Sequence, residues 1–258
     1  DMQLFAQFSQ LLALDMSGCQ HVTLLPDLAP MTALRRLNLS GCWRVACVQG
    51  LASLTELQHL SMVKCWHITA LPGLSALACL ESLDLTKCWH LIELPEPLTL
   101  PKLQQLHLCD CEQLTALPKL DCLPELEILD LAWCTGLKQL PALDALESLQ
   151  LLDCGWCTGM LTPPALGALP ELQYADFHAC RGLSTLPDMS GLLALELLRA
   201  SECTQLQRVP GLEKLQALQH LDLRKCAQLS SLGEADCWQA MPELRYLNLR
   251  GCTSLAEV

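Results

Sequence analysis

Cysteine is the residue type in this sequence with the most obvious capacity for chemistry. The 258 residues include 17 cysteines. Cys154 and Cys157 have the C-x-x-C spacing of thiol–disulfide redox motifs. Cys65 and His67, like Cys88 and His90, place two metal-ligating residue types two positions apart. Judged by residue type alone, the C-x-x-C pair could form a redox centre and the Cys–His pairs could bind a metal.

The spacing of the cysteines, however, follows a repeat. Ten of them recur every 23 residues without a break, and an eleventh follows after 26. Prolines from Pro72 to Pro210 and leucines from Leu57 to Leu218 recur at the same interval. Self-similarity at such a period is typical of solenoid proteins. The periodic cysteines are Cys19, Cys42, Cys65, Cys88, Cys111, Cys134, Cys157, Cys180, Cys203, Cys226 and Cys252.

Each unit reads roughly L-x-x-L-x-L-x-x-C-x-x-L-x-x-L-P-x-L-x-x-L-x-x, and its positions are numbered here from the first leucine. The L-x-L segment alternates with the period of a half-buried strand, and the later proline turns the chain back. One unit cannot bury its leucines alone, but stacked units bury them against their neighbours. We therefore expect a right-handed, β-rich solenoid of the α/β type. Its parallel sheet forms the concave face, and short turns or 3₁₀ segments form the convex side.

This pattern resembles the leucine-rich repeat family, over nearly the whole chain and in eleven units. Residues 1–258 are accordingly expected to form a single leucine-rich repeat domain. The cysteine ladder with Leu-Pro turns is similar to repeats of plant intracellular nucleotide-binding immune receptors and of proteins from unicellular eukaryotes. The resemblance implies that the ninth position points inward where the strand ends, at a place where the family often has asparagine. The ladder is therefore predicted to be architectural.

The chemical alternatives for the thiols are weaker. Neighbouring ladder cysteines would lie about 5 Å apart, but their side chains point the same way, which disfavours disulfides. A single column does not supply the converging ligands of a metal site, so no metal and no cofactor are predicted. Cys154 replaces a core leucine, so both cysteines of the C-x-x-C pair are expected to face inward. Cys109, in contrast, is expected on the exposed concave face and open to modification.

Composition restricts the partners and the location. Lys and Arg number 16 against 28 Asp and Glu, a net charge of -12, which disfavours direct contact with nucleic acid. No apolar run is long enough to span a membrane, and no signal peptide is visible. Reduced thiols favour an intracellular location, in the cytoplasm rather than the nucleus. Open solenoid ends need covers, so we expect missing flanking sequence or a partner there, unless Met2 to Phe8 forms a covering segment.

The third, fifth, seventh and eighth positions are predicted to line the concave face. In units five to eight these positions carry acidic and aromatic side chains and no Lys or Arg. Arg36, Lys64 and Lys87 lie on one side, and Arg199, Arg224, Lys225 and Arg250 on the other. The aspartates are either solvated or contact a basic partner. The predicted binding residues are His107, Asp110, Ile128, Asp130, Trp133, Leu151, Asp153, Trp156, Tyr174, Asp176 and His178.

A second aromatic column follows the ladder directly, at Trp43, Trp66 and Trp89. We expect these rings to stack along the edge of the sheet, either packed against the loop or contacting a neighbouring domain. His67 and His90 stand beside them.

The sequence thus predicts a non-catalytic module that binds a protein on its concave face. His107, His178, Asp130 and Asp153 share that face, but an open sheet offers no pocket that excludes water, and no catalytic motif occurs. The partner is expected to carry basic and apolar side chains. The alternatives are a permanent structural subunit of a large assembly, and the sensing or substrate-recognition part of an immune receptor or ubiquitin ligase.

Overall fold

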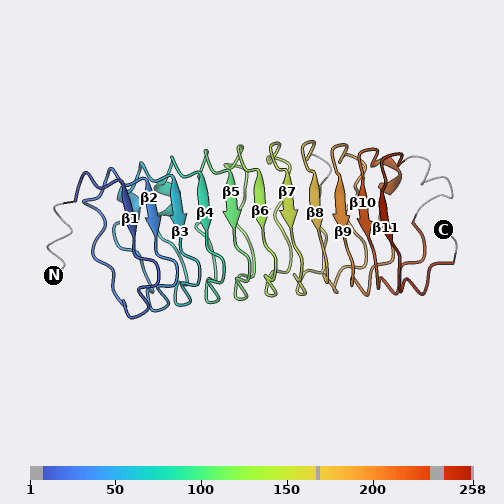
Figure 1. The fold of residues 1–258 in the computed structure, drawn as a ribbon, viewed down its shortest axis with the longest axis horizontal. Coiled ribbons are helices and arrows are strands. Elements are labelled where there is room, and N and C mark those ends of the chain that lie inside the picture. The colour runs from blue at the N-terminus through green and yellow to red at the C-terminus, as the bar shows by residue number, and fades with distance from the viewer. Residues whose placement is uncertain (1–7, 167–168, 233–240, 257–258) are drawn as a thin grey trace.

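The computed structural model describes residues 8–166, 169–232 and 241–256, which form one parallel sheet of eleven strands. The strands lie side by side in chain order along the long axis of the molecule (Figure 1). Each strand has three residues, which are the third to fifth positions of its unit. The strands are β1 (Ala13–Asp15), β2 (Arg36–Asn38), β3 (His59–Ser61), β4 (Ser82–Asp84), β5 (Gln105–His107), β6 (Ile128–Asp130), β7 (Leu151–Asp153), β8 (Tyr174–Asp176), β9 (Leu197–Arg199), β10 (His220–Asp222) and β11 (Tyr246–Asn248).

The predicted solenoid with its parallel sheet is confirmed. Equivalent positions of successive units pair, so Leu83 of β4 lies opposite Leu60 and Leu106. Because the register never slips, side chains at one position form straight columns along the sheet. The leucines of the first, fourth and sixth positions turn inward; Leu80, Leu83 and Leu85 are each 0% exposed.

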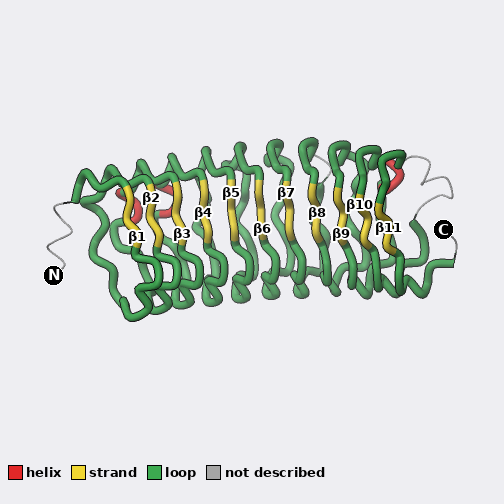
Figure 2. Tube along the Cα trace, in the orientation of Figure 1, coloured by secondary structure: helices red, strands yellow, loops and turns green. Residues whose placement is uncertain are grey.

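The side opposite the strands is mostly loop, with short 3₁₀ helices, as predicted (Figure 2). The 3₁₀ helices η2 (Leu51–Ser53), η3 (Leu74–Ala76) and η4 (Leu212–Lys214) each follow a glycine in the left-handed conformation. At Gly50 an added Cβ would lie 2.2 Å from the backbone nitrogen of Ala29 in the preceding unit. Glycine there permits both the turn and the close stacking of units.

The ninth-position cysteines bond to carbonyls of the preceding unit. The carbonyl of Leu85 accepts the backbone N–H of Cys88 at 3.0 Å and the S–H of Cys111, one unit on, at 3.3 Å. Every ladder cysteine from Cys42 to Cys252 donates in this way, with Sγ–O distances of 3.0–3.3 Å. The predicted architectural ladder is confirmed, and its physical role is to supply buried donors that join adjacent units.

The eighth position adopts the left-handed conformation in every unit. Glycine fills it at Gly18, Gly41 and Gly251, but eight other units place a non-glycine residue there, at φ of 57–63°. Its N–H still bonds to the next unit, as Lys87 does to the Cys109 carbonyl at 2.7 Å. For L-residues this conformation costs about 1–2 kcal/mol each. The residues that carry the cost are Lys64, Lys87, Asp110, Trp133, Trp156, Ala179, Glu202 and Lys225.

Aspartate or asparagine at the fifth position closes the strand with a local turn. The side-chain oxygen of Asp84 accepts the N–H of Thr86, two residues on, at 3.0 Å. The same bond recurs at Asp15, Asn38, Asp130, Asp153, Asp176, Asp222 and Asn248. This turn stabilises the chain where it leaves the sheet, so the recurrence of Asp here has a structural cause that the sequence analysis missed.

One part of the core departs from the leucine pattern. Phe177 occupies the sixth position of its unit and is 0% exposed. Cys154 and Ala200 hold the sixth positions on either side, and Ala175 holds the fourth position of the same unit, all 0% exposed. Small residues at these positions leave space for one large ring. This accounts for Cys154, the first cysteine of the C-x-x-C pair, without redox chemistry.

No helix among the described residues is both long and apolar enough to cross a membrane. The proposed covering segment at Met2 to Phe8 falls almost entirely on residues 1–7, outside the described residues. So does the site of the three-residue insertion in the 26-residue unit, at 233–240.

Candidate functional site

An apolar strip crosses the centre of the strand face. Ile128, Leu151 and Tyr174 occupy the third position of β6, β7 and β8 and pair in register. All three are half-buried, so one side of each remains open to a binding partner.

A column of carboxylates runs beside this strip, and its members differ in their surroundings. Asp130 lies 3.7 Å from the Nδ1 of His107, and its hydrogen bond raises the pKa of that histidine above the ordinary 6.5. Asp176, only 4% exposed, accepts the Tyr174 hydroxyl at 3.1 Å and lies 3.2 Å from an Nη of Arg199. A residue of the basic flank thus reaches into the acidic centre.

Asp153, between these two, has no ion pair within the described part of the chain. Its carboxylate accepts the N–H of Gly155 at 2.8 Å. Burial raises its pKa from the ordinary 3.8 to about 6, repulsion from Asp176 and Asp130 acts in the same direction, and the bond from Gly155 opposes them. At neutral pH this half-buried charge is therefore the least compensated of the three.

Asp153→Asn is expected to stabilise the protein at pH 7 and to leave its stability nearly unchanged below pH 4. The folded-state pKa lies above the unfolded one, so the stabilisation that the proton gives is complete below about pH 4 and is lost as the pH rises through about 6. Two pKa units correspond to at most about 3 kcal/mol, reduced by partial exposure. Urea unfolding from pH 4 to 8 measures the difference.

Asp84→Asn is the matched control, because Asp84 makes the same turn between Ser61 and His107 instead of between carboxylates. Asn38 and Asn248 show that asparagine supports this turn. Equal gains at pH 7 in the two variants would contradict the explanation given for Asp153.

Trp133 and Trp156 form a stacked pair just beyond the ends of β6 and β7. Their ring centroids lie 4.4 Å apart with an interplanar angle of 11°. Trp133 is 44% exposed, whereas Trp156 is half-buried. The rings of His178 and Trp156 are nearly perpendicular, at 82°, with their centroids 5.4 Å apart. The guanidinium carbon of Arg181 lies 5.5 Å from the Trp156 ring centroid.

The structure places the remaining predicted residues around this pair. His178 is fixed by its Nδ1, which lies 2.8 Å from the hydroxyl of Ser201. Asp110 is half-buried and lies 3.7 Å from the Nζ of Lys87. Arg181 and Ser201 were missed by the sequence analysis. Arg181 is the tenth position of unit eight, and that column was examined only for its tryptophans.

The buried and half-buried thiols offer little reactivity. All sixteen cysteines among the described residues are free, and no group of His, Cys, Asp or Glu among those residues is arranged to hold a metal. Burial raises the pKa of Cys154 and Cys157 well above the ordinary 9. Cys109 is half-buried, and burial together with Asp130, Asp110 and Asp153 raises its pKa to about 12. The expectation that Cys109 is readily modified is therefore not supported.

The edge column is stacked as predicted. The ring centroids of Trp43 and Trp66 lie 4.6 Å apart, and those of Trp66 and Trp89 lie 4.8 Å apart. All three rings are half-buried, and the Nδ1 of His90 lies 2.6 Å from the Trp66 carbonyl. The three rings therefore pack on one another along this edge.

A second feature of the strand face lies over β1 to β4, outside the predicted centre. A hollow of about 390 Å³ is lined there by Arg36, Asn38, His59, Ser61 and Asp84, among others. Asn38, Ser61 and Asp84 have short side chains, and Leu14, Leu37 and Leu60 also contribute to the lining. The sequence signal was the run of Asn, Ser and His at the third and fifth positions of these strands. This run was not considered in the sequence analysis, which took account of charged and aromatic residues on this face.

Comparisons with known proteins agree with this fold. No family model and no curated protein matches the sequence. Among solved structures, the chain is similar to the leucine-rich repeat domain of the type III effector XopL, with 25% identity and a TM-score of 0.63 over 96% of this chain and 79% of that one. It is also similar to InlJ from Listeria monocytogenes, whose functional domain includes a cysteine ladder, with 19% identity and a TM-score of 0.52 over 96% of this chain and 55% of that one.

A third similar structure is the mouse RP105/MD-1 complex, at 20% identity and a TM-score of 0.50, covering 96% of this chain and 47% of that one. The chain thus has the leucine-rich repeat fold, with a cysteine ladder.

Proposed function

We propose that this chain is a non-catalytic recognition module that binds a protein through the strand face of β5 to β8. The contacting segment of the partner carries basic and apolar side chains. The observation that carries the proposal is an exposed, stacked tryptophan pair beside a half-buried carboxylate, Asp153, that has no ion pair within the described residues.

Three arguments support this surface. Tryptophan is enriched among the residues that dominate binding energy. Trp133 and Trp156 both have a left-handed backbone conformation, which glycine would adopt without strain, so tryptophan is kept at these positions at a conformational cost. A basic partner side chain would also relieve the repulsion among Asp130, Asp153 and Asp176. The apolar strip of Ile128, Leu151 and Tyr174 would be buried in the same contact.

The composition extends the proposal to partner class and location. A net charge of -12 disfavours phosphate backbones, so we infer a protein partner and not a nucleic acid. The free thiols of the described residues suit a reducing compartment, so we infer an intracellular protein. The RP105/MD-1 complex is an example of a protein of this fold that occurs in a complex with another protein.

Capture of partners by wild-type and variant proteins tests the proposal. Proteins retained by the native chain should be lost with Trp133→Ala/Trp156→Ala and with Asp130→Lys/Asp153→Lys. Removal of one hot spot weakens binding by about 2 kcal/mol or more, a factor of about thirty. Circular dichroism of each variant confirms that the fold is retained.

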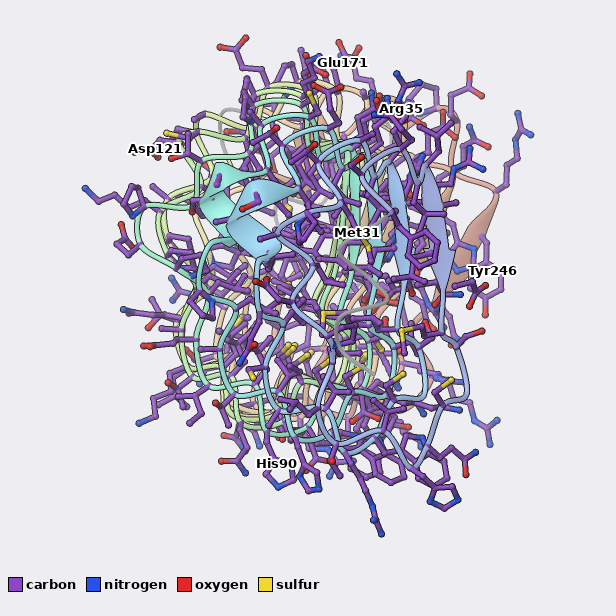
Figure 3. The ribbon with its side chains drawn as sticks, turned by 90° about the vertical axis from the view of Figure 1, so that its left-hand side faces the viewer. Met31, Arg35, His90, Asp121, Glu171 and Tyr246 are labelled. Carbon is purple, nitrogen blue, oxygen red and sulfur yellow. The ribbon has the colours of Figure 1, made fainter. Side chains whose placement is uncertain are left out.

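Asp121→Lys/Glu171→Lys is the matched charge reversal, because both residues are exposed and lie away from the strand face, where Tyr246 lies (Figure 3). This control should retain the partners. Retention of the same proteins by all variants would contradict binding at β5 to β8.

A structural subunit is the second candidate, and the last strand favours it. Tyr246 and Leu247 of β11 are 44% and 39% exposed, whereas the residues equivalent to Leu247 in β2 to β10 are buried. A neighbouring subunit on this strand would bury them.

A further inference from the structure

The tryptophan pair has two outer faces, and the chain itself covers one of them with a guanidinium group. Arg181 lies over Trp156 with its guanidinium carbon 5.5 Å from the ring centroid. An Nη of Arg181 lies 3.6 Å from a carboxylate oxygen of Glu202, in the eighth-position column. The guanidinium therefore sits between an indole face and a carboxylate, an arrangement that combines cation–π attraction with ion pairing.

The other outer face, that of Trp133, is open. Since the two rings are parallel and 4.4 Å apart, this face is turned toward the preceding unit. That unit holds Asp110 in the same column and the exposed Glu112 two residues on. Among the described residues no ring or cation covers this face, and Trp133 is 44% exposed.

The ionic partner of Asp110 does not close the site. The Nζ of Lys87 lies 3.7 Å from Asp110, and the Lys87 side chain is 42% exposed. Exposed pairs of this kind contribute little and exchange readily with solvent. Asp110 also has a much shorter side chain than Trp133, too small to cover the whole of an indole face.

We propose that the outer face of Trp133, together with Asp110 and Glu112, binds an arginine side chain of the protein partner, as Arg181 is bound on the opposite face of the pair. This inference rests on the proposed function and names its central contact. Arginine fits better than lysine because its planar, weakly hydrated guanidinium stacks on an indole while its edge pairs with a carboxylate. The partner is thus recognised through an arginine next to apolar residues.

Nuclear magnetic resonance of the tryptophan indole N–H groups tests the site without knowledge of the partner. The Trp133 signal is assigned by its loss in Trp133→Phe, and the probes are N-acetyl-arginine amide and the neutral N-acetyl-citrulline amide. The arginine probe should shift the Trp133 signal and leave those of Trp43, Trp66 and Trp89 in place. The citrulline probe should bind about fivefold to tenfold more weakly.

Asp110→Asn/Glu112→Gln should weaken the arginine probe by a similar factor, whereas Asp121→Asn, away from the strand face, should not. Equal shifts with arginine and citrulline, or an undiminished response in Asp110→Asn/Glu112→Gln, would overturn the inference. Partner capture separates the two proposals. If the partner is lost with Asp130→Lys/Asp153→Lys but retained with Asp110→Asn/Trp133→Leu, only the proposed arginine site is contradicted. If both double variants retain the partner, the proposed function is contradicted as well.

Discussion

Phe177→Ala is expected to lower the free energy of unfolding by about 3–5 kcal/mol, because it deletes a fully buried ring. The neighbouring positions cannot close the cavity, since Cys154, Ala175 and Ala200 are already small. Phe177→Leu restores the residue usual at this position and should cost less, about 1–2 kcal/mol. Urea unfolding followed by circular dichroism measures both changes.

A second pair of variants tests whether the small side chain of Cys154 makes room for the ring of Phe177. Cys154→Leu alone should destabilise the protein by overpacking, by about 1–3 kcal/mol. In the Phe177→Leu background the same change should be neutral or stabilising, since it fills the space that the ring has left. Additive effects of Cys154→Leu and Phe177→Leu would show that the two side chains do not share one volume.

Replacing Cys111, Cys134 and Cys157 together with alanine is expected to destabilise the protein by about 3–6 kcal/mol. Each change removes a buried sulfur and one donor to a sixth-position carbonyl, at a cost of about 1–2 kcal/mol. The carbonyls keep their backbone N–H partners, which limits the loss. Thermal or urea unfolding of the single and triple variants gives the sum.

Thiol labelling supplies the control for this prediction. Under native conditions a thiol reagent should modify the exposed Cys47 and Cys122 first, and the buried ladder only on unfolding. A triple variant as stable as the native protein, or reaction of Cys111, Cys134 or Cys157 in the folded state, would contradict a structural role for the column.

The repeat made the architecture predictable from the sequence. Leucines at the first, fourth and sixth positions and cysteine at the ninth recur so regularly that strand positions and stacking followed from spacing, and the inward thiols followed from the resemblance to leucine-rich repeats. Each of these features depends on residues that occupy the same position in every unit, and that recurrence can be read directly from the sequence. The stacked edge of Trp43, Trp66 and Trp89 was predictable for the same reason.

Features that join different positions of neighbouring units were not predictable in this way. Arg181, at the tenth position, reaches Trp156 and Glu202, both at the eighth position of neighbouring units, only because its long side chain extends across units. The left-handed eighth position was signalled by Gly18, Gly41 and Gly251, but Lys, Asp and Trp in the other units concealed it. The fifth-position turns were concealed too, because an aspartate that bonds its own backbone looks like a solvated one.

The unbroken register also fixes the distances between features on the strand face. The hollow over β1 to β4 and the tryptophans beyond β6 and β7 are separated by whole turns, so gain or loss of one 23-residue unit would change their separation by about 4.8 Å. Every internal interface would be rebuilt from equivalent side chains. Duplication or deletion of units within the gene can therefore change the spacing between these two features of the strand face without altering either one.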